Sequence, residues 1–268
     1  MTQAQPHYSA TQPAERTVAL SVLIAAYNEE RTVGELLERV LAAALHDLEV
    51  VIVDDGSQDR TGELIARIAH RDPRVRIEGL PTNQGKTAAI ARAIAAARGE
   101  VLVIQDADLE YDPAEIPRLI EPILANQADV VYGSRFLERD PTRTEYFWNR
   151  VGNRFITWWS NLFTGRKLTD VETGFKAFRA GLVKPLRFTS YGFGLEIELT
   201  AMVARTDARI GEVPISYSGR SYQEGKKISL WDGIAAARYV VYYGLFTRTS
   251  RRTREYLREA NEFLAGQH

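Results

Sequence analysis

Cysteine is absent from the 268-residue sequence, and neither sign of charge dominates it. Without cysteine the chain has no disulfide framework, no cysteine-ligated zinc site and no thiol nucleophile, and this composition suits a reducing compartment such as the cytoplasm. Lysine and arginine number 34 against 35 aspartates and glutamates, which leaves a net charge of −1. Since nucleic-acid binding usually shows as a strong positive field, the sequence predicts no nucleic-acid partner.

Several widespread sequence signals are also missing. No apolar run reaches the roughly 18 residues that a transmembrane helix needs. Residues 1–17 are polar and lack the basic segment and cleavage site of a signal peptide, so we expect a disordered tail. Neither the P-loop pattern nor Gly-x-Gly-x-x-Gly follows the first apolar segment, which argues against an ATPase or a dinucleotide-dependent dehydrogenase. The four histidines are scattered, so no histidine metal site is predicted.

Residues 18–133 alternate between short apolar segments and amphipathic helical patterns. Hydrophobic residues make up 45% of the chain and charged residues 26%, as in globular proteins. The alternation predicts an α/β fold with a mixed, mostly parallel sheet flanked by helices on both faces. The expected strands cover 20–26, 49–53, 74–78, 100–105 and 129–133, and the expected helices cover 32–45, 61–69, 85–97 and 114–126.

Residues 134–228 are less regular and richer in arginine, glycine and aromatic side chains. Helices are expected at 146–163 and 194–205, and a strand at 209–217. Residues 230–246 form an apolar, aromatic helical pattern followed by Arg248, Arg251, Arg252 and Arg254. We therefore divide the chain into a tail (1–17), one α/β domain (18–228) and C-terminal amphipathic, basic helices (229–268).

Three acidic residues at alternating positions follow the expected strand 100–105. In an extended segment the side chains of Asp106, Asp108 and Glu110 point the same way and repel one another unless a cation lies between them. Carboxylate oxygens suit Mg²⁺ or Mn²⁺, which commonly bridge to substrate phosphates. The alternative is a solvated acidic loop that caps the helix beginning near Pro113.

Polar residues also follow the first and second expected strands, at the sheet edge where ligands of α/β proteins bind. Asp54 and Asp55 end the second strand, where a carboxylate can accept from a base N–H or a ribose hydroxyl. After the first strand, Tyr27 can stack on a base and Glu29 can bind ribose or base. For both segments the alternative is helix capping.

A further group of candidates consists of cations near glycines in the less regular half. Arginine binds phosphate through two parallel hydrogen bonds, and lysine binds it as a point charge. Each cation alone is typical of a surface, but their grouping near glycines favours a surface that faces a diphosphate substrate. The group comprises Arg135, Arg150, Arg154, Arg220, Lys226 and Lys227.

Six segments occur in the order found in family 2 glycosyltransferases with the GT-A fold, which the chain resembles from about residue 20 to 245. They are SVLIAAYNEE (21–30), VVIVDDGSQD (50–59), NQGKTAAI (83–90), DADLEYDP (106–113), YGSR (132–135) and TGFKAF (173–178). The later segments GFGLEIEL and EVPISYSGRSYQEGKKI narrow the resemblance to the dolichyl- and polyprenyl-phosphate sugar transferases. Ala25 and Glu110 depart from the mannose synthases of this group, which usually have Pro and often have Gln there.

The resemblance implies a nucleotide-diphosphate sugar donor (GDP-mannose first, UDP-glucose next), Mg²⁺ or Mn²⁺, and a polyprenyl or dolichyl monophosphate acceptor. It makes Asp106, Asp108 and Glu110 the metal ligands. It implies catalytic roles for Asp108, Arg135 and Arg150, with the two arginines facing the acceptor phosphate. The implied donor-binding residues are Ala25, Tyr27, Glu29, Val53, Asp54, Asp55, Lys86, Asp106, Ala107, Asp108, Arg220 and Lys226.

The implied reaction is an in-line attack of the lipid phosphate on the anomeric carbon, with inversion. A phosphomonoester has its second pKa near ~6 and is largely a dianion at neutral pH, so positioning can replace a strong general base. A lipid acceptor predicts peripheral binding at the cytoplasmic face of a membrane, with helices 146–163 and 230–246 at headgroup depth. The alternative is that their aromatic residues lie in the core or in a homodimer interface. A separate membrane-protein partner is a further alternative.

Three other functions share parts of this pattern. A transferase of the same fold with a soluble or polysaccharide acceptor is disfavoured by the segment GRSYQEGKKI. A nucleotidyltransferase normally has a glycine-rich loop with arginine or lysine after the first strand, where this chain has the acidic AAYNEE. A non-catalytic module that binds nucleotide sugars is disfavoured by the complete set of charged residues, and turnover alone excludes it.

Overall fold

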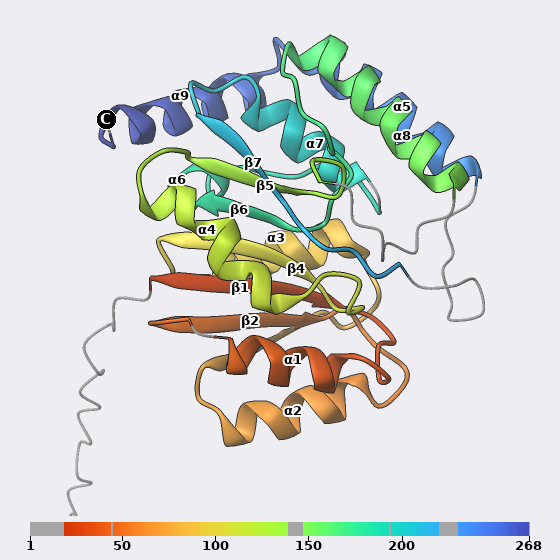
Figure 1. Ribbon diagram of the computed structural model, residues 1–268, viewed down its shortest axis with the longest axis vertical. Coiled ribbons are helices and arrows are strands. Elements are labelled where there is room, and N and C mark those ends of the chain that lie inside the picture. The colour runs from red at the N-terminus through yellow and green to blue at the C-terminus, as the bar shows by residue number, and fades with distance from the viewer. Residues whose placement is uncertain (1–18, 44, 139–146, 193, 220–229, 268) are drawn as a thin grey trace, which may run out of the picture.

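A single mixed sheet organises the computed structural model, which describes residues 19–43, 45–138, 147–192, 194–219 and 230–267. In this part of the chain the strand order is β3-β2-β1-β4-β6-β5-β7 (Figure 1). β6 runs antiparallel to β4 and β5, and the other neighbouring strands are parallel, which confirms the mixed, mostly parallel sheet. The strands are β1 (Leu20–Ala26), β2 (Leu48–Asp54), β3 (Val75–Gly79), β4 (Val101–Asp106), β5 (Val130–Ser134), β6 (Lys176–Arg179) and β7 (Ile210–Pro214).

Helices connect and cover these strands, and their bounds differ from the expected ones by a few residues. The expected helix 230–246 divides into an α-helix and a π-helical turn, η3. The described helices are α1 (Val33–Ala42), α2 (Thr61–Arg71), α3 (Lys86–Ala96), η1 (Pro113–Glu115), α4 (Ile116–Leu124), α5 (Phe147–Thr164), α6 (Ala180–Val183), α7 (Gly194–Val203), α8 (Leu230–Val241), η3 (Tyr242–Phe246) and α9 (Arg251–Ala265).

The two faces of the sheet bury separate hydrophobic cores. Successive side chains of a strand point to opposite faces, so Leu23 of β1 enters one core while Val22 and Ile24 enter the other. Residues of α3, α7, α8 and α9 complete the first core, and residues of α1, α2 and α4 complete the second. Since both faces are covered, ligands approach this sheet at the ends of its strands.

β6 was not expected from the sequence, because it is short and begins with a buried lysine. Lys176 is 1% exposed, and its ammonium donates to the carbonyl oxygens of Val171 (3.1 Å) and Thr173. The same ammonium lies 4.9 Å from the ring centre of Tyr132 in β5. These contacts compensate the burial of the charge, and they let a lysine occupy a position that apolar patterning reserves for hydrophobic residues.

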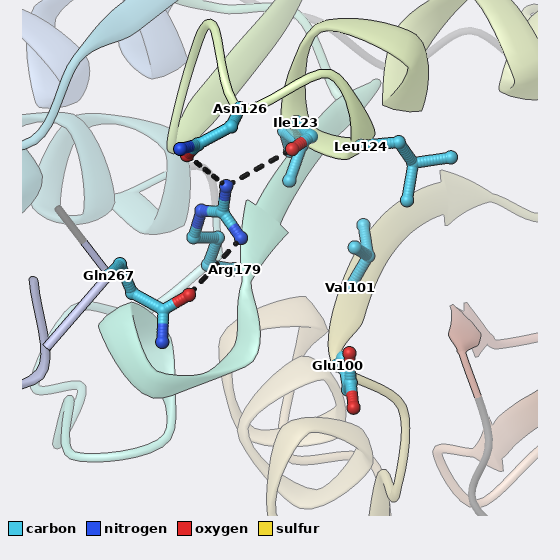
Figure 2. A pocket seen from close by; sticks show the side chains of 7 residues that line it. All are labelled: Glu100, Val101, Ile123, Leu124, Asn126, Arg179 and Gln267. Carbon is cyan, nitrogen blue, oxygen red and sulfur yellow. Dashed lines mark hydrogen bonds between the residues drawn. The ribbon is translucent and has the colours of Figure 1, made fainter.

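A hollow of about 290 Å³ lies at the amino-terminal end of β4 (Figure 2). Arg179 of β6 reaches across it and donates to Asn126 (2.8 Å), to the carbonyl of Ile123 (3.1 Å) and to Gln267 (3.4 Å). Its Nε atom also pairs with Asp129 (3.1 Å). Because this arginine is engaged by the protein, and because the hollow lies at the opposite end of β4 from Asp106, we assign it a structural role.

α5 and α8 pack against each other beyond the carboxyl-terminal ends of the strands (Figure 1). None of the helices in the described ranges combines the length and the hydropathy that a bilayer crossing requires. The predicted tail (1–17) lies outside the described residues, so the proposed division of the chain stays a prediction.

Candidate active site

The strand register places three predicted donor-binding residues in one row. Ala25 of β1 pairs with Val53 of β2 on one side and with Asp106 of β4 on the other. Ala26 pairs with Asp54, which brings the end of β2 to the same edge of the sheet. Parallel strands therefore deliver candidates that are about 80 positions apart in the sequence to one carboxyl-terminal edge.

The loop after β1 is tied to the loop after β4. The Thr32 hydroxyl lies within hydrogen-bond distance of both Glu29 Oε2 (2.8 Å) and the carbonyl oxygen of Ala107 (2.9 Å). Tyr27, just before Glu29, is 43% exposed. An exposed aromatic side chain at the end of a strand suits the predicted stacking on a nucleobase.

The two aspartates at the end of β2 have different surroundings. Asp55 is 3% exposed, and its carboxylate accepts from the backbone N–H groups of Gln84 and Gly85, both at 2.8 Å. Asp54 is partly exposed and accepts from the backbone of Ser57 (3.0 Å). Asp55 thereby fixes the turn that begins α3 and places Lys86, and the predicted contact of both aspartates with the nucleoside stays a prediction.

Lys86, the first residue of α3, bridges two carboxylates. Its Nζ lies 2.7 Å from Asp106 Oδ1 and 2.8 Å from Glu196 Oε1 of α7. Burial alone would lower the pKa of the Lys86 ammonium, but the charges of Asp106 and Glu196 outweigh it and hold that pKa well above its ordinary value. Lys86 is therefore a cation fixed beside the first D-x-D carboxylate.

Gly174 allows Asp106 to take this position. A Cβ atom at residue 174 would lie 2.0 Å from Asp106 Oδ2 and 2.8 Å from its Cγ, so no other residue fits without moving the carboxylate. The Gly174 N–H also donates to the hydroxyl of Tyr111 (3.1 Å), which comes from the loop after β4. Steric exclusion of a side chain by the Asp106 carboxylate thus explains why the TGFKAF segment has glycine at residue 174.

The three predicted metal ligands have separate partners. Asp108 Oδ1 accepts from the Glu110 backbone (3.1 Å), and Glu110 Oε2 accepts from the Tyr217 hydroxyl (2.7 Å), while Asp106 faces Lys86. Within the described residues, no three aspartate, glutamate or histidine side chains gather as a ready cluster, so the three-ligand set stays a prediction. The ammonium beside Asp106 shows that this position favours a cation, and two carboxylates completed by substrate phosphates suit Mg²⁺ or Mn²⁺.

Arg135 forms a buried ion pair that sequence reasoning missed. Its guanidinium donates to both oxygens of Asp170, at 2.6 and 2.8 Å, and the two side chains are only 6% and 0% exposed. Its Cζ also lies 5.1 Å from the ring centre of Tyr217. The role of Arg135 at the acceptor phosphate stays a prediction. Arg150 is exposed on α5, and Arg220 and Lys226 lie outside the described residues.

A second group of buried charges lies beside the Lys86 cluster. Burial raises the pKa of the Glu172 carboxyl to about 7, with a further increase from the charge of Glu196, and burial lowers the pKa of Lys176 to about 8. In the part of the chain that the structure describes, Glu172 Oε1 and Glu196 Oε2 are both buried and have no hydrogen-bond partner. This part of the protein therefore holds more negative charge than its described hydrogen bonds satisfy.

Replacing Glu172 with glutamine should stabilise the protein above neutral pH. Between the ordinary pKa of 4.5 and the native value of about 7, the native state binds more protons at Glu172 than the unfolded state does. The stability of the wild type therefore falls as pH rises through this range, by at most about 3 kcal/mol. Between pH 4.5 and 8 the melting temperature of E172Q should rise relative to that of the wild type. The control E121Q, on the exposed face of α4, should keep a constant difference from the wild type. A constant difference for E172Q as well would contradict this account.

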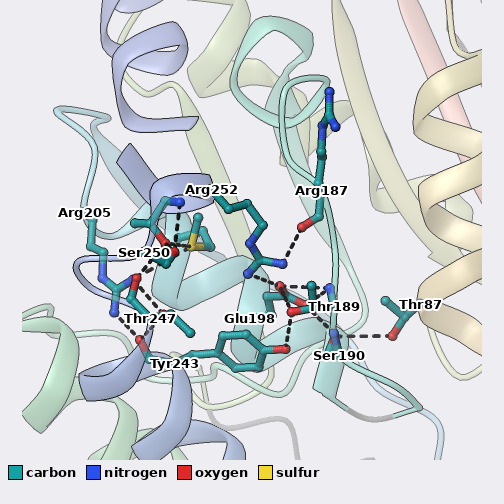
Figure 3. A network of polar contacts seen from close by, with 12 residues as sticks. Thr87, Arg187, Thr189, Ser190, Glu198, Arg205, Tyr243, Thr247, Ser250 and Arg252 are labelled. Atoms are coloured by element: carbon teal, nitrogen blue, oxygen red, sulfur yellow. Dashed lines mark hydrogen bonds and ion pairs between the residues drawn. The ribbon is translucent and has the colours of Figure 1, made fainter. Parts of the chain in front are cut away.

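A buried network connects the C-terminal helix to the start of α3 (Figure 3). Glu198 of α7 is fully buried and accepts from Arg252 of α9 (2.8 Å) and from the backbone of Ser190 (2.7 Å). The Ser190 hydroxyl lies 3.5 Å from that of Thr87, the residue after Lys86. α9 and α7 therefore support the loop that packs against the N-terminus of α3.

Residues of this site that were not predicted include Asp170, Glu196, Glu198 and Tyr217. The sequence could have indicated Glu196 and Glu198, because they are two carboxylates within the otherwise mostly apolar segment of α7. That helix is buried along its whole length, and buried carboxylates need partners. Asp170 and Tyr217 have no comparable signal, because their partners come from distant segments.

Comparison with known proteins agrees with these observations. The model of the family "Glycosyl transferase family 2" matches residues 21–189. An undecaprenyl-phosphate mannosyltransferase of Micrococcus luteus is 33% identical over 76% of this chain and 85% of its own. A dodecaprenyl-phosphate galacturonate synthase of Rhizobium johnstonii (30% identical, 79% of this chain) and a dolichol-phosphate mannosyltransferase of Pyrococcus furiosus (31%, 77%) are longer, and the matches span 62% and 58% of them.

Solved structures show the same fold. The glucosyl-3-phosphoglycerate synthase of Mycobacterium tuberculosis in complex with UDP is 21% identical, with a TM-score of 0.63 over 94% of this chain and 87% of that one. A complex of the same enzyme with Mn²⁺, UDP and phosphoglyceric acid gives a TM-score of 0.64 over 88% of this chain and 78% of that one, also at 21% identity. At this identity the likeness concerns the fold, and it confirms the expected GT-A architecture. The family match covers more than half of the chain, so the chain belongs to glycosyl transferase family 2.

Proposed function

We propose that the protein transfers a hexose from a nucleotide-diphosphate sugar to a polyprenyl or dolichyl monophosphate. The observation that carries this proposal is the row formed by Ala25, Val53 and Asp106 at the carboxyl-terminal edge of the sheet, with the D-x-D segment at its end. The names of the three relatives, all polyprenyl- or dolichyl-phosphate sugar transferases, support the lipid acceptor. GDP-mannose is the first candidate donor and UDP-glucose the second.

In this proposal the donor lies along the edge of the sheet. Tyr27 stacks on the base, and Glu29 and Asp54 bind the nucleoside. Asp106 and Asp108 would hold Mg²⁺ or Mn²⁺, with Glu110 as a further ligand, and the bound ion would neutralise charge on the departing diphosphate. Ala107 lies between the two ligands, and Arg220 and Lys226 bind the diphosphate.

The chemistry at the sugar needs no proton transfer. An oxygen of the lipid phosphate dianion forms a bond to the anomeric carbon as the bond from that carbon to the diphosphate oxygen breaks, which inverts the configuration. In this proposal Arg150, which is exposed on α5, holds the acceptor phosphate, and Arg135 is the second arginine of the acceptor site. Their contribution is positioning and electrostatic stabilisation.

We propose that an exposed apolar surface of α5 and η3 binds the membrane that carries the acceptor. On α5 the residues Val151, Phe155, Trp158 and Leu162 are between 43% and 62% exposed, and their spacing of four, three and four positions places them on one face. On η3, which contacts α5, Tyr242, Leu245 and Phe246 are between 47% and 71% exposed. Large exposed apolar surfaces mark interaction sites, and aromatic side chains beside arginines suit a lipid headgroup layer.

Serine at both Phe155 and Trp158 should lower binding to anionic liposomes at least tenfold, since each buried aromatic side chain contributes roughly 1.5–3 kcal/mol. Flotation of the full chain with vesicles that contain anionic lipid measures this effect. The matched control is L124S, because Leu124 is 65% exposed on α4, away from this surface. Unchanged flotation combined with a dimer that dissociates in the double variant would show that this face is a homodimer interface instead.

The proposed reaction is tested by incubating the protein with undecaprenyl phosphate in detergent, Mg²⁺ or Mn²⁺, and one donor at a time. The donor panel contains GDP-mannose, UDP-glucose, UDP-galactose and a UDP-N-acetylhexosamine, and mass spectrometry detects the glycolipid. A product with one donor and none with EDTA supports the proposal and identifies the sugar. No glycolipid with any donor would contradict it.

A further inference from the structure

One ammonium group serves two carboxylates at the candidate metal position. Lys86 Nζ lies 2.7 Å from Asp106 Oδ1 and 2.8 Å from Glu196 Oε1. The lysine and aspartate side chains are about a quarter exposed, at 27% and 23%, whereas that of Glu196 is 8% exposed. The ammonium is therefore shared between a carboxylate that ligands can reach and one that they cannot.

Glu196 has an unused acceptor. Its Oε2 atom is buried and has no hydrogen-bond partner among the described residues. A buried, unsatisfied carboxylate oxygen is costly, and the position of Glu196 in the first turn of α7 compensates only part of that cost. A second hydrogen bond from the Lys86 ammonium would satisfy this oxygen, but the ammonium is held towards Asp106.

A divalent cation at Asp106 would change this balance. Two positive groups at one carboxylate repel each other, and the lysine is the flexible one, with four carbons between its charge and the backbone. Among the described residues, Glu172 and Lys176 are further charged groups that interact with this cluster. Glu172 lies in the segment before β6, and Lys176 is the first residue of β6. Glu196, by contrast, is the carboxylate that already contacts the Lys86 ammonium.

We propose that Lys86 is the resident counter-ion of Asp106, which moves fully onto Glu196 when the divalent cation binds, so that this pair sets the cation affinity of the site. This inference rests on the metal position in the proposed function. Glu196 acts through Lys86 and is a positioning residue. It lies 110 positions from Lys86 in the sequence, so the pair forms only in the fold.

The inference predicts opposite effects for the two partners on Mn²⁺ affinity. K86M removes the competing cation and should tighten Mn²⁺ binding roughly tenfold. E196Q removes the charge that receives the ammonium, so Lys86 stays on Asp106 and Mn²⁺ binding should weaken roughly three- to tenfold. Because Glu196 acts through Lys86, the double variant should bind Mn²⁺ as K86M does.

Isothermal titration of the full chain with Mn²⁺ alone, without nucleotide, tests these effects, and circular dichroism confirms that each variant is folded. K184M is the matched control, since Lys184 is exposed after α6, and K86R keeps the charge should K86M not fold. The wild-type affinity in E196Q, or no tightening in K86M, would overturn the inference. If the inference fails in this way but D106N abolishes Mn²⁺ binding, the metal site of the proposed function is still supported. If none of the proteins binds Mn²⁺, both the inference and the metal site are overturned.

Discussion

Asparagine at Asp106 should lower sugar transfer about 10³-fold or more while the protein stays folded. The substitution removes a carboxylate that would hold the divalent cation, and it leaves the Lys86 ammonium with Glu196 as its remaining carboxylate partner. Loss of one group that stabilises charge in the transition state typically costs about two to three orders of magnitude, and weaker cation binding adds to this loss. Single-turnover rates at saturating donor and Mn²⁺, with circular dichroism to monitor folding, measure the effect.

The matched control for this prediction is D112N. Asp112 belongs to the same acidic segment, but its exposed carboxylate accepts from the backbone N–H of Ala114 (3.0 Å) and caps η1. Its replacement should change the rate less than about threefold, because the asparagine side-chain oxygen can still accept this hydrogen bond and Asp112 is not one of the proposed metal ligands. A D106N protein that keeps near wild-type transfer would remove Asp106 from the metal site.

Alanine at Asp170 should destabilise the protein by about 3–5 kcal/mol, which is the usual cost of leaving one member of a buried ion pair without its partner. The Arg135 guanidinium is 6% exposed and donates to both Asp170 oxygens. Burial alone would lower the pKa of Arg135, but the Asp170 charge outweighs it and holds that pKa well above its ordinary value. The D170A substitution removes this support, and because a guanidinium stays protonated in proteins, the arginine remains a buried charge without its partner. The melting temperature should fall by roughly 6–15 °C.

R150A separates this structural effect from an effect on catalysis. Arg150 is exposed on α5, so alanine there should leave the melting temperature within about 1–2 °C of the wild type, because surface substitutions usually change stability little. The same variant should raise the apparent KM for the lipid phosphate if Arg150 holds the acceptor. A stable D170A protein would contradict the role of the ion pair.

The first half of the fold was readable because its elements are encoded locally. Alternating and helical hydrophobic periods placed β1 to β5 and α1 to α4 within a few residues, and the polar residues after β1, β2 and β4 indicated the functional edge of the sheet. Parallel strands meet at that edge whatever their order, so the approximate location of the site did not require knowledge of the topology.

The remaining features depend on contacts between distant residues. The sequence indicates Arg135 as a phosphate-binding candidate, and its partner Asp170, 35 positions later, is identified only by the fold. Lys86 and Glu196 likewise meet across 110 positions. β6 was missed because it places Lys176 where an apolar residue is expected, and the lysine is accommodated by carbonyl oxygens and the Tyr132 ring.

The identity of the acceptor is the central claim, and a competition in one reaction tests it most directly. The protein is incubated with Mn²⁺, its preferred donor, undecaprenyl phosphate in detergent and an equal concentration of phosphoglyceric acid, a ligand of the structural neighbour. Mass spectrometry then determines which molecule carries the sugar. The account predicts a glycolipid with the mass of the lipid phosphate plus one hexosyl residue (a hexose less one water), and no such product with D106N. Sugar on phosphoglyceric acid, or free sugar released with the nucleotide diphosphate, would contradict it.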